Sequence, residues 1–259
     1  MTSTKRQAYQ FLVSIREQLD RQLPGPTEMR RCVNETITDA ISDPAKKHLR
    51  NPEHVFVNKY LAEPLFQLVS DYPGMTKEKA KKAFLSESHE SLSTYCSGSP
   101  ARRLRHPFNK VLGVNVATIY QRWRRELKKT NPLTQSCPDF AFRSPFPHNI
   151  VFEAKYFSRG NRVKAQSELV ASSYQAFFYR ALPSDRTETS RPDWDYEYAC
   201  LIAYDASPEG FLIDAWQQLD SEVRDGFWEG ANVFVMVLRG VNLTTGSTRP
   251  AMPAREPGR

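Results

Sequence analysis

Two short apolar runs joined by a proline-containing bend constrain the fold of this chain more than any other stretch. Residues 137–157 read Cys-Pro-Asp-Phe-Ala-Phe-Arg, then a bend with two prolines, then Asn-Ile-Val-Phe-Glu-Ala-Lys-Tyr-Phe. Aromatic and β-branched residues on both sides of a turn predict two neighbouring strands. Side chains alternate between the faces of a strand, so Glu153 and Lys155 should project from one face and Ala154 from the other.

A carboxylate and an ammonium inside an apolar strand are costly to bury unless they are paired. Asp139 begins the preceding run, where it is placed to face Glu153 and Lys155. Two carboxylates beside one ammonium can hold a divalent cation through oxygen ligands and can steer a water beside it. The alternative is purely structural: a solvated ion pair on one strand face and an ordinary Pro-Asp turn.

Together, Pro138-Asp139 and Glu153-Ala154-Lys155 resemble the signature of the PD-(D/E)xK superfamily, the restriction-endonuclease-like nucleases. The resemblance implies an α/β fold with a mixed central sheet flanked by helices, and Mg²⁺-dependent hydrolysis of DNA phosphodiester bonds, with Mn²⁺ able to substitute for Mg²⁺. Asp139, Glu153 and the carbonyl of Ala154 would bind the metal. Lys155 would position the attacking water and stabilise the transition state.

Nucleases of this superfamily often add a glutamate from an upstream helix. Glu63 is the first candidate, because it lies in an apolar helix expected from about Glu53 to Val69. Glu35 and Glu126 are the other candidates. Spacing alone does not decide among these three.

A second resemblance lies in an expected helix over residues 165–181. Gln175-Ala-Phe-Phe-Tyr179 matches a Gln-x-x-x-Tyr pattern found in some branches of the same superfamily. One helical turn separates the two polar side chains, so both would reach the phosphate or orient the site. An amphipathic helix with Tyr179 in the core explains the pattern equally well.

The positive charge of the chain is concentrated in one segment. Residues 101–130 carry nine Lys or Arg and one Glu, a local charge of +8, whereas the whole chain carries +7, so the remaining residues carry about −1. Such a basic patch is expected of a protein that binds double-stranded DNA. A solvated helical face is the alternative, although such faces usually mix both signs.

Residues 112–125 look like the turn and second helix of a helix-turn-helix, but a proline falls in the expected first helix. A basic helix along the phosphate backbone is the favoured interpretation. The candidate DNA contacts lie in this basic helix and in the loop that follows Lys155. The cations of the loop could equally be ordinary surface charges. The residues are Arg122, Arg124, Arg125, Arg159, Arg162 and Lys164.

The chain divides into three expected parts. Residues 1–110 form a helical N-terminal region with helices at 5–22, 28–41, 53–69 and 76–93. Residues 111–240 form the nuclease core, which includes the basic helix and a strand at about 196–204, a helix at 212–223 and a strand at 232–238. Residues 241–259, rich in Pro, Gly, Ser and Arg, form a flexible tail.

Several other classes of protein are disfavoured by what the sequence lacks. The four cysteines and five histidines show no metal-ligand spacing, which argues against a zinc centre. There is no glycine-rich phosphate loop, so no nucleotide cofactor is expected. No long apolar run or signal peptide is present, and we therefore expect a cytoplasmic protein without membrane contact.

Taken together, the sequence favours a type II restriction endonuclease that acts as a homodimer on a short duplex site, within a restriction-modification system. The alternative in the same class is a structure-specific repair or recombination nuclease, or another defence nuclease. The alternative in a different class is a non-catalytic DNA-binding protein that uses residues 101–130.

Overall fold

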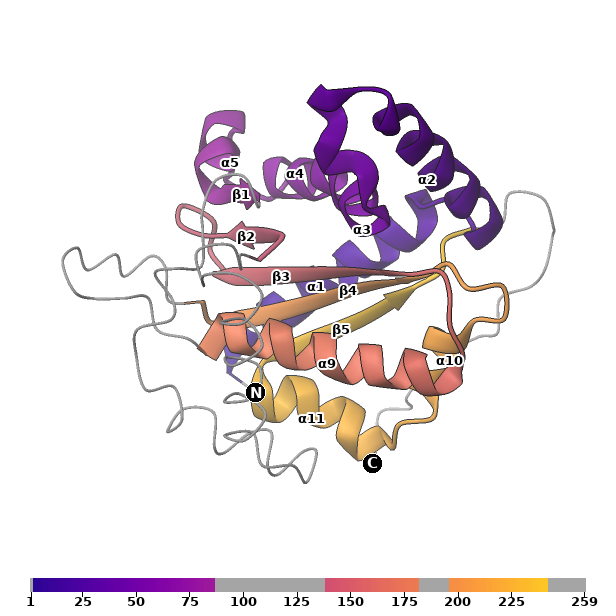
Figure 1. The fold of residues 1–259 in the computed structure, drawn as a ribbon. Coiled ribbons are helices and arrows are strands. Elements are labelled where there is room, and N and C mark those ends of the chain that lie inside the picture. Colours follow the sequence, from indigo (N-terminus) through magenta and orange to yellow (C-terminus); the bar gives the residue numbers. More distant parts are fainter. Residues whose placement is uncertain (1, 87–137, 182–195, 242–259) are drawn as a thin grey trace, which may run out of the picture.

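The computed structural model describes residues 2–86, 138–181 and 196–241, which form an α/β fold around a mixed open sheet (Figure 1). The strands lie side by side in chain order and are β1 (Phe84–Ser86), β2 (Phe140–Phe142), β3 (Ile150–Phe157), β4 (Tyr198–Asp205) and β5 (Val233–Leu238). The strands from β1 to β3 pair antiparallel, whereas β3, β4 and β5 pair parallel. The two strands expected within residues 137–157 are confirmed as β2 and β3.

Helices cover both faces of the sheet. The N-terminal helices are α1 (Ser3–Gln22), α2 (Pro26–Ile41), the 3₁₀ helix η1 (Pro44–Arg50), α3 (Pro52–Val55), the π-helix η2 (Phe56–Leu61), α4 (Ala62–Ser70) and α5 (Lys77–Ala83). The helices of the other face are α9 (Arg162–Ala181), α10 (Phe211–Gln217) and α11 (Ser221–Ala231). Figure 1 shows α9 and α11 on one side of the strands and α1 on the other.

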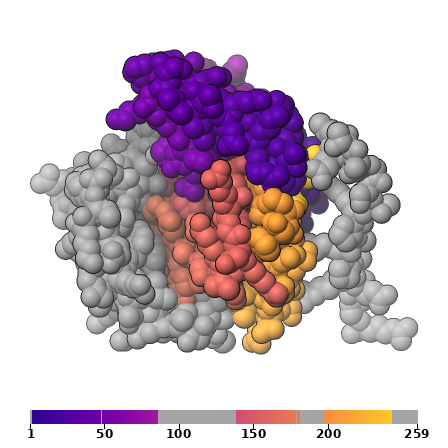
Figure 2. All heavy atoms as spheres, turned by 45° about the vertical axis from the view of Figure 1, so that its right-hand side comes forward, coloured from indigo at the N-terminus to yellow at the C-terminus, as the bar shows by residue number. Residues whose placement is uncertain are grey.

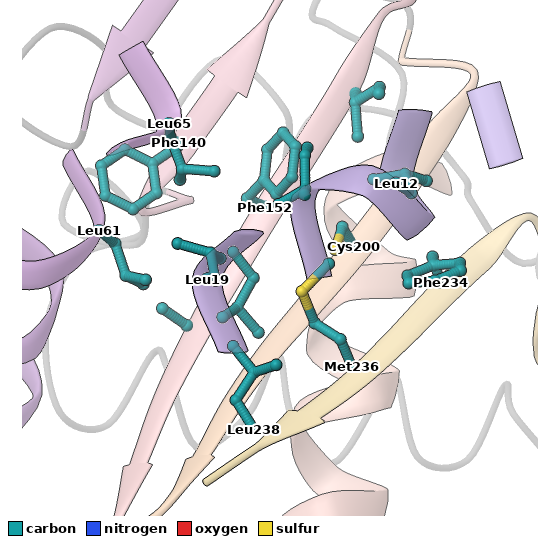
Figure 3. Close-up of a cluster of buried hydrophobic side chains, with 14 of the residues drawn as sticks. Leu12, Leu19, Leu61, Leu65, Phe140, Phe152, Cys200, Phe234, Met236 and Leu238 are labelled. Carbon is teal, nitrogen blue, oxygen red and sulfur yellow. The ribbon is translucent and has the colours of Figure 1, made fainter. Parts of the chain in front are cut away.

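The N-terminal helices share one hydrophobic core with the sheet. Leucines of α1, η2 and α4 meet the strand residues Phe152, Cys200 and Met236 (Figure 3). Figure 2 shows the N-terminal residues, in indigo and purple, packed directly against the residues of the central strands and helices. Burying an aliphatic or aromatic side chain contributes about 1.5–3 kcal/mol, so this core stabilises the helices and the sheet together.

The second core lies on the opposite face of the same strands. There Val151 and Phe157 of β3 pack with α9, whereas Phe152 and Ala154 belong to the core of the N-terminal helices. The expected alternation of β3 is therefore confirmed. It places Glu153 and Lys155 on the α9 face of β3, a strand whose other residues are almost all apolar.

Two expected helices differ from the structure. The helix expected over 76–93 ends at Ala83, and Phe84 and Leu85 enter β1 instead, because they pair with Phe142 and Ala141 of β2. The helix expected over 212–223 is two helices, α10 and α11, which are separated between Gln217 and Ser221. In the first case tertiary pairing with β2 outweighs the helical pattern of the local sequence.

The helix expected over 53–69 is present but irregular. It consists of α3, the π-helical turn η2 and α4, and Pro64 lies in the first turn of α4. Proline has no N–H to donate, so a change of helical geometry just before it is expected. The irregular segment starts beside β3, because α3 contacts that strand.

Candidate active site

The site lies just before the first residue of β2, beyond which no other strand in the described part of the chain pairs with that edge of β3. Asp139 precedes β2 by one residue, and because Phe140 pairs with Phe152, Asp139 lies opposite Glu153. The Asp139 Oδ2 atom accepts a hydrogen bond of 2.6 Å from the backbone N–H of Ala154. The Asp139 N–H in turn donates to the Phe152 carbonyl at 3.1 Å. These two bonds fix the Asp139 carboxylate against β3.

Lys155 lies between two carboxylates. Its Nζ atom is 2.7 Å from Oε1 of Glu153 and 2.9 Å from Oε1 of Glu53. The Lys155 side chain is only 14% exposed, and that of Glu153 only 3%. The predicted group of Asp139, Glu153 and Lys155 is therefore brought together in space, with Glu53 as a fourth member.

Glu53 is the member of this candidate site that the sequence reasoning missed. It lies in the first turn of α3, where the side chain of Asn51 accepts a hydrogen bond of 2.9 Å from the Glu53 N–H, and Pro52 occupies the first helical position. Asn followed by Pro is a recognisable helix start, and a carboxylate is favoured in the first turn. The sequence carries no signal, however, that this helix packs against β3, 102 residues further along the chain.

The three glutamates named from the sequence do not occupy this position. Glu63 is exposed on α4, and Glu35 is exposed on α2, where it pairs with Arg31 at 2.7 Å. Glu126 lies outside the described residues. The structure brings Glu53, and not Glu63, to Lys155, because the first turn of α3, rather than α4, places a carboxylate beside that ammonium.

Burial and neighbouring charges shift the proton affinities of the site in opposite directions. Burial first, and then the charge of Glu153, raise the pKa of Asp139 well above its ordinary value, although the hydrogen bond from Ala154 acts against them. Burial acts to lower the pKa of Lys155, but the charges and hydrogen bonds of Glu153 and Glu53 outweigh it and raise that pKa. Lys155 is therefore held as an ammonium, while Asp139 resists ionisation.

This donor set suits a hard divalent cation. After burial, the charge of Glu153 is the main cause that raises the pKa of Asp139, and a bound cation would relieve that repulsion. The Ala154 carbonyl faces the same strand edge as its N–H, which donates to Asp139 beyond the end of β2. Within the described ranges no three His, Cys, Asp or Glu side chains form a ready-made metal cluster. The groups that could hold a divalent cation are therefore the carboxylates of Asp139 and Glu153 and the carbonyl of Ala154.

Three of the predicted DNA contacts follow β3 directly. Arg159, Arg162 and Lys164 are all exposed. The Asn161 side chain accepts a hydrogen bond of 3.0 Å from the Lys164 N–H and so fixes the start of α9. The other three predicted contacts, Arg122, Arg124 and Arg125, lie outside the described residues.

Gln175 and Tyr179 contact each other on α9. The Gln175 Nε2 atom donates to the Tyr179 hydroxyl at 2.8 Å. Tyr179 is buried in the core beneath α9, as expected if this helix is simply amphipathic. Gln175 is half-buried, and its role in the site remains a prediction.

Comparisons of the chain with family models, with curated proteins and with solved structures returned no match. None of the helices in the described ranges is long and apolar enough to cross a membrane. What the chain does must therefore be inferred from the groups around Lys155.

Proposed function

We propose that this chain is a Mg²⁺-dependent endodeoxyribonuclease of the PD-(D/E)xK superfamily, and specifically a type II restriction endonuclease that acts as a homodimer. The observation that carries the proposal is the meeting of Asp139, Glu153 and Lys155 at the edge of β3 just beyond its pairing with β2. A solvated ion pair would not explain why this group is buried beside a third carboxylate, that of Glu53. Because buried ionic groups commonly cost stability, a function for this group would explain why it is retained.

The arrangement of the sheet supports the same proposal. A restriction-endonuclease-like fold needs its acidic residues on adjacent strands of a mixed sheet that is flanked by helices. Here Asp139 precedes β2, and Glu153 and Lys155 lie on β3, which pairs antiparallel with β2 and parallel with β4. Helices cover both faces of these strands (Figure 1).

Each member of the group has a role in this proposal. Asp139, Glu153 and the carbonyl of Ala154 would hold Mg²⁺ or Mn²⁺, which supplies Lewis-acid polarisation of the phosphodiester and a more acidic water. The Lys155 ammonium would orient the attacking water and donate hydrogen bonds to the charge that develops on the phosphate. Arg159, Arg162 and Lys164 would bind phosphates of the duplex, together with the basic segment 101–130.

A plasmid cleavage assay tests this proposal. With Mg²⁺, the wild-type chain should cut supercoiled plasmid into discrete fragments, and Lys155→Ala should bind the plasmid but cut at least about a hundredfold more slowly. The control is Lys82→Ala, since Lys82 is exposed on α5 and should be dispensable. The measurement is the rate of fragment formation on agarose gels, alongside a binding assay.

Other outcomes would replace the proposal. If wild type and Lys155→Ala both bind and neither cuts intact, nicked or branched DNA, the chain is a non-catalytic DNA-binding protein. Cutting of branched DNA alone would indicate a structure-specific repair or recombination nuclease. A smear of products would indicate a nuclease without sequence specificity.

A further inference from the structure

The ammonium of Lys155 lies where a cation would otherwise be needed. Glu153 is buried, so its charge requires a partner, and in this structure the partner at 2.7 Å is Lys155. Glu153 is also one of the two carboxylates proposed to hold the divalent cation. The ammonium and the divalent cation therefore compete for the same carboxylate, because like charges near one acceptor repel each other.

We propose that Lys155 is the internal counter-ion of the site, which a divalent cation must displace from Glu153 before the site is loaded. This inference rests on the proposed cation site but adds a step that the proposed function does not contain. Lys155 then sets the cation affinity as well as acting on the phosphate. In the cation-free chain the ammonium keeps the buried carboxylates compensated, and cation binding releases it.

Glu53 can remain the carboxylate partner of the Lys155 ammonium after that ammonium leaves Glu153. Its Oε1 atom already lies 2.9 Å from the Lys155 Nζ, and its side chain is 31% exposed, more than that of Glu153. The ammonium can therefore leave Glu153 without losing both acceptors, and leaving it with none would be costly. Glu53 is a positioning residue in this scheme, since it holds Lys155 while Glu153 turns to the cation.

Opposite effects on cation affinity follow for the two substitutions. Lys155→Met removes the competing positive charge and should tighten cation binding by about tenfold or more. Glu53→Gln leaves Glu153 as the only carboxylate acceptor shown for Lys155 and should weaken cation binding. A lysine that served only to stabilise the fold would produce neither shift.

Calorimetric titration of the full chain with Ca²⁺, and separately with Mn²⁺, tests these shifts. The variants are Lys155→Met, Glu53→Gln and the control Lys82→Met, which removes the same charge from an exposed position on α5. We expect tighter binding for the first, weaker binding for the second and wild-type binding for the third. If wild type binds the ion and Lys155→Met binds it equally or less tightly, the counter-ion inference is wrong while the proposed function stands. If neither wild type nor any variant binds either ion, the proposed function itself fails.

A labelling experiment on the wild-type chain does not depend on the folding of a variant. Lysine acetylation by acetic anhydride is measured by peptide mass spectrometry without and with saturating Ca²⁺. Acetylation of Lys155 should rise severalfold with the ion, because the ammonium loses one of its two carboxylate acceptors. Acetylation of Lys82 should stay constant. Unchanged or lower acetylation of Lys155 at saturating Ca²⁺ would overturn the inference.

Discussion

Glu53 and Glu63 differ by ten positions in the chain but occupy different environments. Glu53 is 2.9 Å from the Lys155 Nζ, whereas Glu63 is exposed on α4. Both lie in the first turn of a helical segment, and each is next to a proline in the sequence. They form a matched pair in which only one side chain touches the site.

Substituting these two glutamates separates a site residue from a surface residue. Glu53→Gln should slow DNA cleavage by about tenfold to a hundredfold, because Lys155 loses one of its two carboxylate partners. Glu63→Gln should leave the rate unchanged. The measurement is the initial rate of plasmid cleavage at saturating Mg²⁺. Equal rates for the two variants would show that Glu53 has no part in the chemistry.

The sequence was sufficient to place Asp139, Glu153 and Lys155 together, because strand alternation is a local property and the proline-containing bend joins neighbouring strands. The same reasoning could not predict that Glu53 joins this group. Its position depends on how α3 packs against β3, and no local pattern reports contacts between segments 102 residues apart. The sequence therefore favoured Glu63, with Glu35 and Glu126 behind it, and gave no sign of Glu53.

At the scale of elements, the turn between α1 and α2 is tied to the end of β5. The Val241 N–H donates to the Leu23 carbonyl at 3.1 Å, and Pro24 forms a parallel bridge with Val241. The hydroxyl of Tyr204, which has one proton to donate, lies within hydrogen-bonding distance of the carbonyls of Pro24 and Arg239. This junction holds the N-terminal helices onto the sheet at the end opposite the start of β5.

Gly240 is the residue on which this junction depends. Its φ is +68°, and a Cβ atom there would lie 2.5 Å from the Leu23 carbonyl oxygen and would also overlap that of Pro24. Gly74 has a similar φ of +82°, but a Cβ atom added there would have no neighbour within 4 Å. The two glycines share the backbone requirement and differ only in the space around them.

Alanine at these two glycines should therefore have unequal costs. Gly74→Ala should lower the free energy of unfolding by about 1–2 kcal/mol, the cost of a left-handed conformation. Gly240→Ala should lower it further, because backbone oxygens must also move. Urea unfolding followed by circular dichroism measures both. Equal losses of unfolding free energy for the two variants would mean that the backbone oxygens at the junction move away from the added Cβ atom without cost.

The elements themselves were predicted unevenly from the sequence. Apolar periodicity located α1, α2 and α9, whose cores follow helical spacing, and the apolar runs of β4 and β5. Phe84 and Leu85 were assigned to a helix, because a charged helical stretch runs directly into them. Their strand conformation depends on pairing with β2, more than fifty residues later in the chain, which local periodicity cannot report.

At the scale of the molecule, the N-terminal helices and the sheet share a core, so we expect them to unfold together. His148 lies where these regions meet, in edge-on contact with the rings of Tyr72, Phe146 and Tyr198. Neither ring nitrogen of His148 has a hydrogen-bond partner among the described residues. Burial lowers the pKa of His148 below its ordinary value of 6.5.

This histidine should make the stability of the whole fold depend on pH. Well above pH 6.5 the imidazole is neutral in both states and has no effect. Below it the unfolded chain binds a proton that the folded chain resists, so the free energy of unfolding falls by up to about 1.4 kcal/mol per pH unit. The fall ends once the pH passes the lowered pKa of the folded state.

Urea unfolding at pH 7.5, 6.5 and 5.5 measures this dependence. His148→Phe, which keeps a ring among the aromatic neighbours and removes the titrating group, should flatten the fall between pH 6.5 and 5.5. Parallel pH profiles for wild type and the variant would show that the loss of stability in acid comes from other groups.

The 102-residue separation between Glu53 and Lys155 determines when during folding the group is completed. A nascent or partly unfolded chain can bring Asp139 next to Glu153 by closing a short loop, but it cannot complete the group until the N-terminal helices have docked on the sheet. The four side chains therefore come together only in a molecule whose N-terminal helices have docked. For the nuclease proposed above, this late assembly would keep incompletely folded chains from cutting the DNA of the cell that makes them.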